Sequence, residues 1–136
     1  MIGGVLQDRT TVRGVGGNPA TIPSIVQSST CYVDLGDVDD LILFLDVREF
    51  TNPAGMGVVQ LVYETSPTHE DASFVPLFPA FALSITTSPR VDLIYCAYAA
   101  VPVARYLRWR ITVNPGGTGT YDACFRITYA GYAAGA

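Results

Sequence analysis

The sequence predicts an all-β fold, an antiparallel two-sheet sandwich of jelly-roll type with about eight strands. Apolar and polar residues alternate with period two in several stretches, and glycine and proline interrupt these stretches roughly every ten residues. No stretch has the 3.6-residue period of an amphipathic helix. With 136 residues, the chain is the size of one domain and is long enough to bury a core.

Residues 1–25 differ from the rest of the chain because they are rich in glycine and have only scattered apolar positions. We predict that they form an extended N-terminal arm or an edge segment, and that residues 26–136 form the sandwich. Two alternatives stay open for this segment. It adds as a strand to a neighbouring subunit, or it is the first strand of the sandwich itself. In the first case the contact residues would be Val5, Leu6, Val12 and Val15.

Two strands are predicted in the middle of the chain, over Leu41–Phe50 and Val58–Thr65. Both stretches alternate, and the sequence Asn52–Gly55 between them has the composition of a turn. Shorter runs rich in apolar and β-branched residues predict further strands over 32–35, 74–77, 81–86 and 91–96.

The clearest alternation lies near the C-terminus, over Arg105–Val113. It places Leu107, Trp109 and Ile111 on one face, so we expect Trp109 to be buried. A second alternating run over Tyr121–Tyr129 follows a turn-like Asn-Pro-Gly-Gly sequence. We therefore predict that these two runs pair as a hairpin.

Composition excludes several classes of protein. The net charge of −4 argues against a partner made of nucleic acid, and no apolar run is long enough for a membrane-spanning helix. The N-terminus lacks the features of a signal peptide, so synthesis in the cytosol is expected. All eight basic residues are arginine, and only 15% of residues are charged, as suits a subunit buried in an assembly. Nucleotide bias in the genome explains the absence of lysine equally well.

No catalytic site or cofactor is predicted. The single histidine, His69, lies in a turn-like sequence without a matching nucleophile motif, so the chain is not expected to be an enzyme. The three cysteines are too widely spaced for a metal motif and are expected to be free thiols. An acidic cluster indicates either a turn or a calcium site, and the turn is favoured. Its members are Asp34, Asp37, Asp39 and Asp40.

A second candidate surface comes from the other face of the 105–113 strand, which carries Tyr106, Arg108 and Arg110. An exposed tyrosine–arginine patch suits a protein interface or a glycan. The simplest interpretation of the outward arginines is that they pair across strands with acidic residues such as Asp46, Glu64 or Asp122.

Three stretches, 43–48 (LFLDVR), 62–67 (VYETSP) and 104–110 (ARYLRWR), resemble β-sandwich proteins of tailed-bacteriophage virions. These include head decoration (capsid-cementing) and tail accessory proteins, and the resemblance covers residues 32 to 130. It implies a structural virion protein that cements the capsid by binding the major capsid protein or other virion subunits, and a location in the virion. Self-association is expected as well, because apolar segments such as 74–81 and 97–103 would otherwise be exposed.

The alternative is a carbohydrate-binding sandwich in a phage tail or adhesin. Discoidin-type sandwiches have a similar strand of arginine, aromatic and apolar residues, although this chain lacks their bracketing cysteines.

Overall fold

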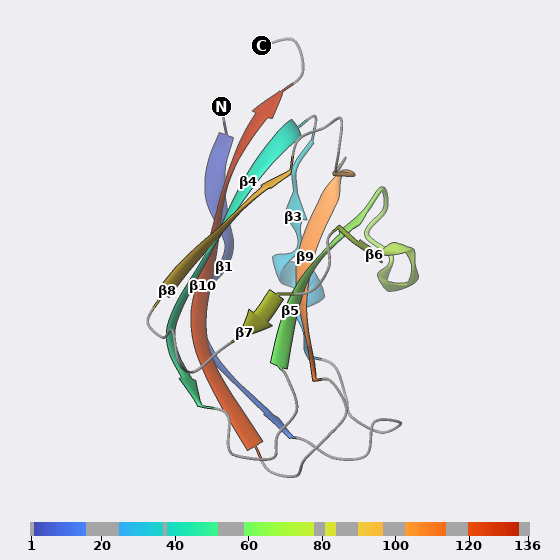
Figure 1. The fold of residues 1–136 in the computed structure, drawn as a ribbon. Coiled ribbons are helices and arrows are strands. Elements are labelled where there is room, and N and C mark those ends of the chain that lie inside the picture. Colours follow the sequence, from blue (N-terminus) through green and yellow to red (C-terminus); the bar gives the residue numbers. More distant parts are fainter. Residues whose placement is uncertain are drawn as a thin grey trace.

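The computed structural model describes residues 2–15, 25–36, 38–51, 59–77, 81–83, 90–96, 103–113 and 120–133. These form two antiparallel sheets that face each other (Figure 1). The four-stranded sheet has the order β1 (Ile2–Val15), β10 (Thr120–Ala133), β4 (Val38–Thr51) and β8 (Arg90–Cys96). The six-stranded sheet has the order β2 (Ile25–Val26), β9 (Tyr106–Val113), β5 (Val59–Ser66) and β6 (Val75–Pro76), with β3 (Val33–Asp34) on β9 and β7 (Phe81–Leu83) on β5.

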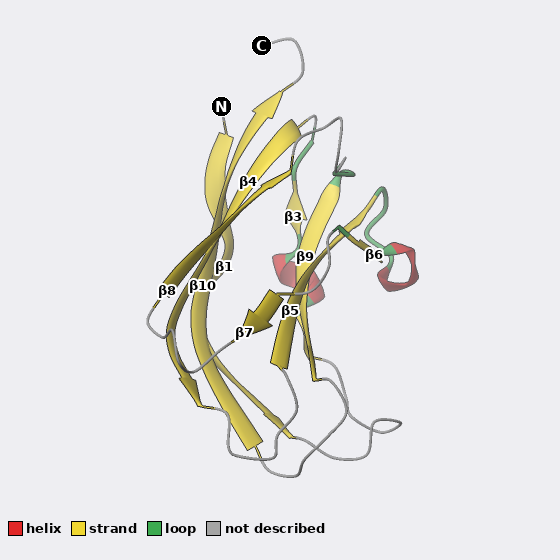
Figure 2. Cartoon of the chain, viewed as in Figure 1, coloured by secondary structure: helices red, strands yellow, loops and turns green. Residues whose placement is uncertain are grey.

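The sandwich is a jelly roll, as predicted. If β2 and β3 count as one interrupted strand, and β6 and β7 as another, the two sheets hold eight strands in the double Greek-key order. The helical turns among the described residues are two 3₁₀ turns, η1 (Ser29–Cys31) and η2 (Asp71–Ser73) (Figure 2). No helix of the described residues is long and apolar enough to cross a membrane.

The predicted hairpin between the last two long strands is wrong. β9 pairs with β5 in one sheet, and β10 pairs with β1 and β4 in the other. The inward faces of β9 and β10 meet across the core instead, where the Trp109 and Phe125 rings pack edge to face with centroids 5.1 Å apart. Trp109 is buried, as the alternation predicted, and only 3% of it is exposed.

The core-facing pattern of β4 changes phase along its length. Leu41, Leu43, Leu45 and Val47 are buried, and the next buried residue is Phe50, three positions on. The pairing with β10 shifts register at this point, which is the signature of a β-bulge. The bulge lets Phe50 return to the core after two exposed residues.

The N-terminal segment belongs to the sandwich. Ile2–Val15 is strand β1, which pairs along its length with β10 at the edge of the four-stranded sheet. Of the two alternatives that the sequence left open, this is the strand of the sandwich itself and not an arm reaching to a neighbour. Leu6 is 2% exposed within the core, at one of the two register shifts in β1. Residues 16–24 lie outside the described part of the chain.

Two glycines of β1 make room for tyrosines of β10. Gly4 pairs with Tyr129, and a Cβ at Gly4 would come within 2.6 Å of the Tyr129 hydroxyl. Gly14 pairs with Tyr121, and a Cβ there would overlap the Tyr121 ring. The glycines therefore do not mark a flexible arm, because they let bulky side chains of the neighbouring strand lie across the β1 backbone.

Replacing Gly14 with alanine should destabilise the fold, because Tyr121 is only 1% exposed and has little room to move. We expect Gly14→Ala to lower the free energy of unfolding by about 1–3 kcal/mol, the usual cost of overpacking. Urea denaturation measures this change. Gly3→Ala is the matched control, since its new Cβ would lie 3.7 Å from the nearest atom, an ordinary contact. Equal stability of the two variants would contradict the proposed packing.

Candidate interaction surfaces

The buried guanidinium of Arg108 is the centre of a polar cluster on the outer face of the six-stranded sheet. Its Nε donates to Glu64 Oε1 over 2.8 Å, and one terminal nitrogen donates to Asp71 Oδ1 over 2.5 Å and to the Tyr32 hydroxyl over 2.8 Å. Only 1% of Arg108 is exposed. The alternation places Arg108 on the outward face of β9, but it is not the open surface residue that this face suggested. We call Tyr32, Glu64, Asp71, Phe74 and Arg108 the Arg108 cluster.

Burial of Arg108 comes from the segment 66–77, which folds back over the sheet. The Phe74 ring lies 4.0 Å from the guanidinium carbon, a cation–π contact, and Phe74 itself is 8% exposed. The Leu77 amide donates to the Tyr63 carbonyl over 2.9 Å, so the far end of the segment is attached to β5. The apolar segment 74–81 is therefore partly buried here, although Val75 is 57% exposed and residues 78–80 lie outside the described part.

The predicted cross-strand pairing of the arginines is correct for Glu64. This carboxylate accepts from Arg108 and also from Arg110, whose Nε lies 3.2 Å from both carboxylate oxygens. Arg126 lies directly opposite Asp46 in the pairing of β10 with β4, and its Nε also lies 3.6 Å from Asp8 of β1. Two of the three candidate residues on this face, Arg108 and Arg110, thus bind within the chain.

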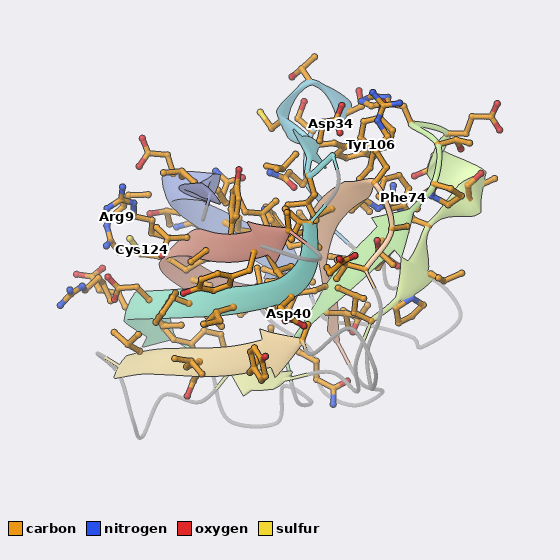
Figure 3. The ribbon with its side chains drawn as sticks, turned by 90° about the horizontal axis from the view of Figure 1, so that it is seen from above. Arg9, Asp34, Asp40, Phe74, Tyr106 and Cys124 are labelled. Carbon is orange, nitrogen blue, oxygen red and sulfur yellow. The ribbon has the colours of Figure 1, made fainter. Side chains whose placement is uncertain are left out.

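An aromatic group borders the Arg108 cluster, and Figure 3 shows Asp34, Tyr106 and Phe74 on the same side of the molecule. The exposed His69 ring packs between Tyr32 and Tyr106, with centroid distances of 5.0 and 5.3 Å. Tyr106 is half-buried, and the Arg105 guanidinium lies 5.2 Å from its ring centre. This patch combines the exposed His69 with the partly buried Tyr32 and Tyr106.

The acidic cluster forms a turn at its first member. Asp34 accepts from the Gly36 amide over 3.0 Å, and Gly36 has a left-handed φ of 62°. Arg105 binds both carboxylate oxygens of Asp34, and these hydrogen bonds hold the pKa of Asp34 below its usual value. Asp37 lies outside the described residues. Within the described part, no group of three acidic, histidine or cysteine side chains is arranged to hold a metal ion.

The four apolar candidates of the N-terminal segment do not form one surface. Val5 is 42% exposed, Leu6 is in the core, and Val12 packs partly against it. Val15 pairs with Thr120, and its side chain lies outside the described features. These residues belong to the four-stranded sheet, and Tyr106 belongs to the other, so the structure does not bring the two predicted groups together.

The cysteines are free thiols in this structure, with Cys31 exposed, Cys96 buried and Cys124 in between. Burial raises the pKa of Cys96 to about 11. Cys124 and Arg9 lie together on the outer face of the four-stranded sheet (Figure 3), where Arg9 also binds Asp46 over 3.0 Å.

A surface that the sequence analysis missed lies on β8. Val91, Leu93 and Tyr95 are 60%, 58% and 53% exposed, and they project from one face of an edge strand. We call these three residues the β8 stripe. Of the residues between and after them, Ile94 and Cys96 are buried and Asp92 is partly buried. A strand that is apolar on both faces is the signal that could have indicated this surface, because only one face can be in the core.

Comparison with known proteins shows the fold alone. No family model and no curated protein matches the chain. A structure of infectious bursal disease virus, Gx strain, is similar with a TM-score of 0.54 and 11% identity, over 98% of this chain and 33% of that chain. The crystal structure of the VP2 subviral particle of the same virus matches with a TM-score of 0.54 and 10% identity, over 94% of this chain and 31% of that chain. The chain thus spans about a third of the length of these proteins.

Removing Arg108 should strongly destabilise the sandwich, because it leaves the buried Glu64 carboxylate with one fewer partner and removes the support of Phe74. We expect Arg108→Ala to lower the free energy of unfolding by about 3–5 kcal/mol, as measured by urea denaturation. Arg105→Ala is the control, because it removes an arginine from an exposed ion pair and should change stability little. A small effect of Arg108→Ala would show that the cluster does not stabilise the fold.

The attachment of the 66–77 segment should depend on pH through Asp71. The hydrogen bond from Arg108 lowers the pKa of Asp71 below its usual value of 3.8. Its contribution to stability is therefore complete above that value and is lost as the pH falls through the lowered pKa. We expect wild type to have a higher Tm than Asp71→Asn at pH 7, and the difference to vanish in strong acid. Glu70→Gln controls for loss of a neighbouring charge, and a difference that persists at the lowest pH would contradict this assignment.

Proposed function

We propose that this chain is a structural virion protein that acts by protein–protein binding, as a decoration or cementing protein on a capsid. Its partners would be the major capsid protein or other virion subunits, together with further copies of itself. Its place of action would be the assembled particle. No cofactor or chemical step is part of this function.

The β8 stripe is the observation that carries this proposal. Three large apolar side chains, each more than half exposed, lie in a row on an edge strand. Exposed apolar rows of this kind are costly in a solitary soluble protein and are found where another protein covers them. The face around them is favourable for burial, because Ile42 and Phe44 of the neighbouring strand β4 are also only partly buried.

The fold and the composition support the same proposal. The jelly roll is a common architecture of viral capsid proteins, and the solved structures described above are of a virus and of a subviral particle. Only 15% of residues are charged and none is lysine, which fits a surface that other subunits cover.

The rings around His69 do not favour the carbohydrate-binding alternative. A sugar ring stacks on an open, flat aromatic surface, whereas the rings around His69 pack against one another. The Tyr32 and Tyr106 rings meet His69 at interplanar angles of 43° and 88°. Glycan-array binding without association with particles would nevertheless favour that alternative.

Mass spectrometry of purified virus particles from the source tests the proposal. We expect this chain at a constant ratio to the major capsid protein, corresponding to hundreds of copies per particle. Replacing Leu93 with glutamate should sharply reduce that ratio, because a carboxylate would have to be desolvated in the contact.

Val75→Glu is the matched control for this substitution. Val75 is 57% exposed, almost the same as Leu93, but it lies on β6 in the other sheet. This variant should remain on particles at the wild-type ratio. Absence of the wild-type chain from purified particles would refute the proposed function.

A further inference from the structure

The two edges of the four-stranded sheet differ in regularity. β8 pairs with β4 over seven consecutive positions without a register shift. None of the described strands pairs with the opposite edge of β8. The opposite edge is β1, which has two register shifts and exposes Asp8, Arg9 and Arg13. Bulges and charges are the features that protect an edge strand from pairing with another chain. β8 has no bulge, and its exposed stripe carries no charge, although Asp92 points inward between Val91 and Leu93.

We propose that β8 pairs in antiparallel orientation with β8 of a second copy of this chain, around a twofold axis at Leu93. The two four-stranded sheets would then form one continuous sheet of eight strands, four from each copy. This inference adds a contact between copies of the chain to the proposed function. It rests on that function only for the claim that the contact forms on a virus particle.

The length and side-chain pattern of β8 determine the register. Its seven residues, Arg90–Cys96, have Leu93 at their midpoint, so an axis there pairs every residue of the strand. Leu93 then lies opposite its own copy, and Val91 lies opposite Tyr95. Directly opposite residues share a face, so the two stripes form one apolar row, and pairs of aromatic and β-branched residues favour such a contact.

Neighbouring registers are less favourable. An axis at Asp92 would place this carboxylate opposite its own copy, and like charges in that position are destabilising. An axis at Ile94 would pair only Asp92–Cys96. An axis that passes between two residues would place each outward side chain opposite an inward one of the other copy. A twofold axis perpendicular to the sheet does not allow this arrangement.

The proposed β8 contact involves fewer residues than a stable protein interface. Stable interfaces use about 20–30 residues from each partner, and β8 has seven. We therefore expect weak pairing in dilute solution and occupied pairing where copies are held close together, as on a particle. A covalent trap is thus a better test than the oligomeric state alone.

Single cysteines on β8 test the register directly, in a Cys31→Ser, Cys124→Ser background that removes the accessible thiols. Opposite residues of antiparallel strands have Cα atoms about 4.5–5.5 Å apart, within the range that a disulfide spans. At high protein concentration with a mild oxidant, Leu93→Cys should form a covalent dimer. Val91→Cys and Tyr95→Cys should each stay largely monomeric alone and cross-link when mixed. Circular dichroism verifies that each variant is folded.

The outcomes separate this inference from the proposed function. Efficient dimers of Val91→Cys alone, or no cross-link from any folded variant, would overturn the β8 pairing even if the chain is abundant in particles. A cross-linking pattern centred on Leu93 with no chain in particles would leave the pairing in place and refute the virion role. If a cysteine variant does not fold, concentration-dependent sedimentation of wild type against Leu93→Glu decides, since Leu93 is 58% exposed and its replacement should abolish association when β8 is the contact.

Discussion

The packing of Trp109 joins the parts of this sandwich. Its ring meets Phe125 across the core, and its indole nitrogen donates to Gln7 Oε1 on β1 over 3.1 Å. A buried indole N–H needs a partner, so burial of this side chain requires β1 to be in place. Close to Trp109, the side-chain amide of Gln27 donates from Nε2 to the Leu6 carbonyl over 2.5 Å. The β1 bulge turns this carbonyl away from regular strand pairing. The two sheets and the first strand therefore depend on one another.

The sequence predicted strands better than their partners. Period-two alternation identifies which side chains of Tyr106–Val113 and Thr120–Ala133 face the core, but two strands of one sheet and two facing strands have the same pattern. The turn-like residues between them therefore suggested a hairpin. For β1 the sequence left two alternatives open, an arm or the first strand of the sandwich, because glycine weakens strand propensity. The signal lay in β10, where Tyr121 and Tyr129 lie opposite Gly14 and Gly4.

The surfaces were only partly predictable for a related reason. Alternation placed Arg108 on the outward side of β9, which is correct, but the outer side of a sheet is not always solvent. Residues 66–77 cover it, and their position follows from the binding of Asp71 and Phe74 to Arg108 and not from local propensity. The β8 stripe was hidden in the opposite way, because apolar residues on both faces of a short strand resemble a fully buried strand. The sequence pattern shows which side chains share a face of a strand. Tertiary packing determines which of the two faces is buried.

The irregularity of β1 bears on how large an assembly these edges can build. The described edges of the six-stranded sheet are strands of two or three residues, too short to template a long neighbour. With β1 bulged and charged, β8 is the one described edge that is both long and regular. A molecule with one edge strand that can pair binds one neighbour and then has no free edge left. It therefore cannot grow into a fibre by adding one strand after another. The bulges that turn Leu6 into the core would in this way also guard a concentrated population of the protein against amyloid-like polymerisation.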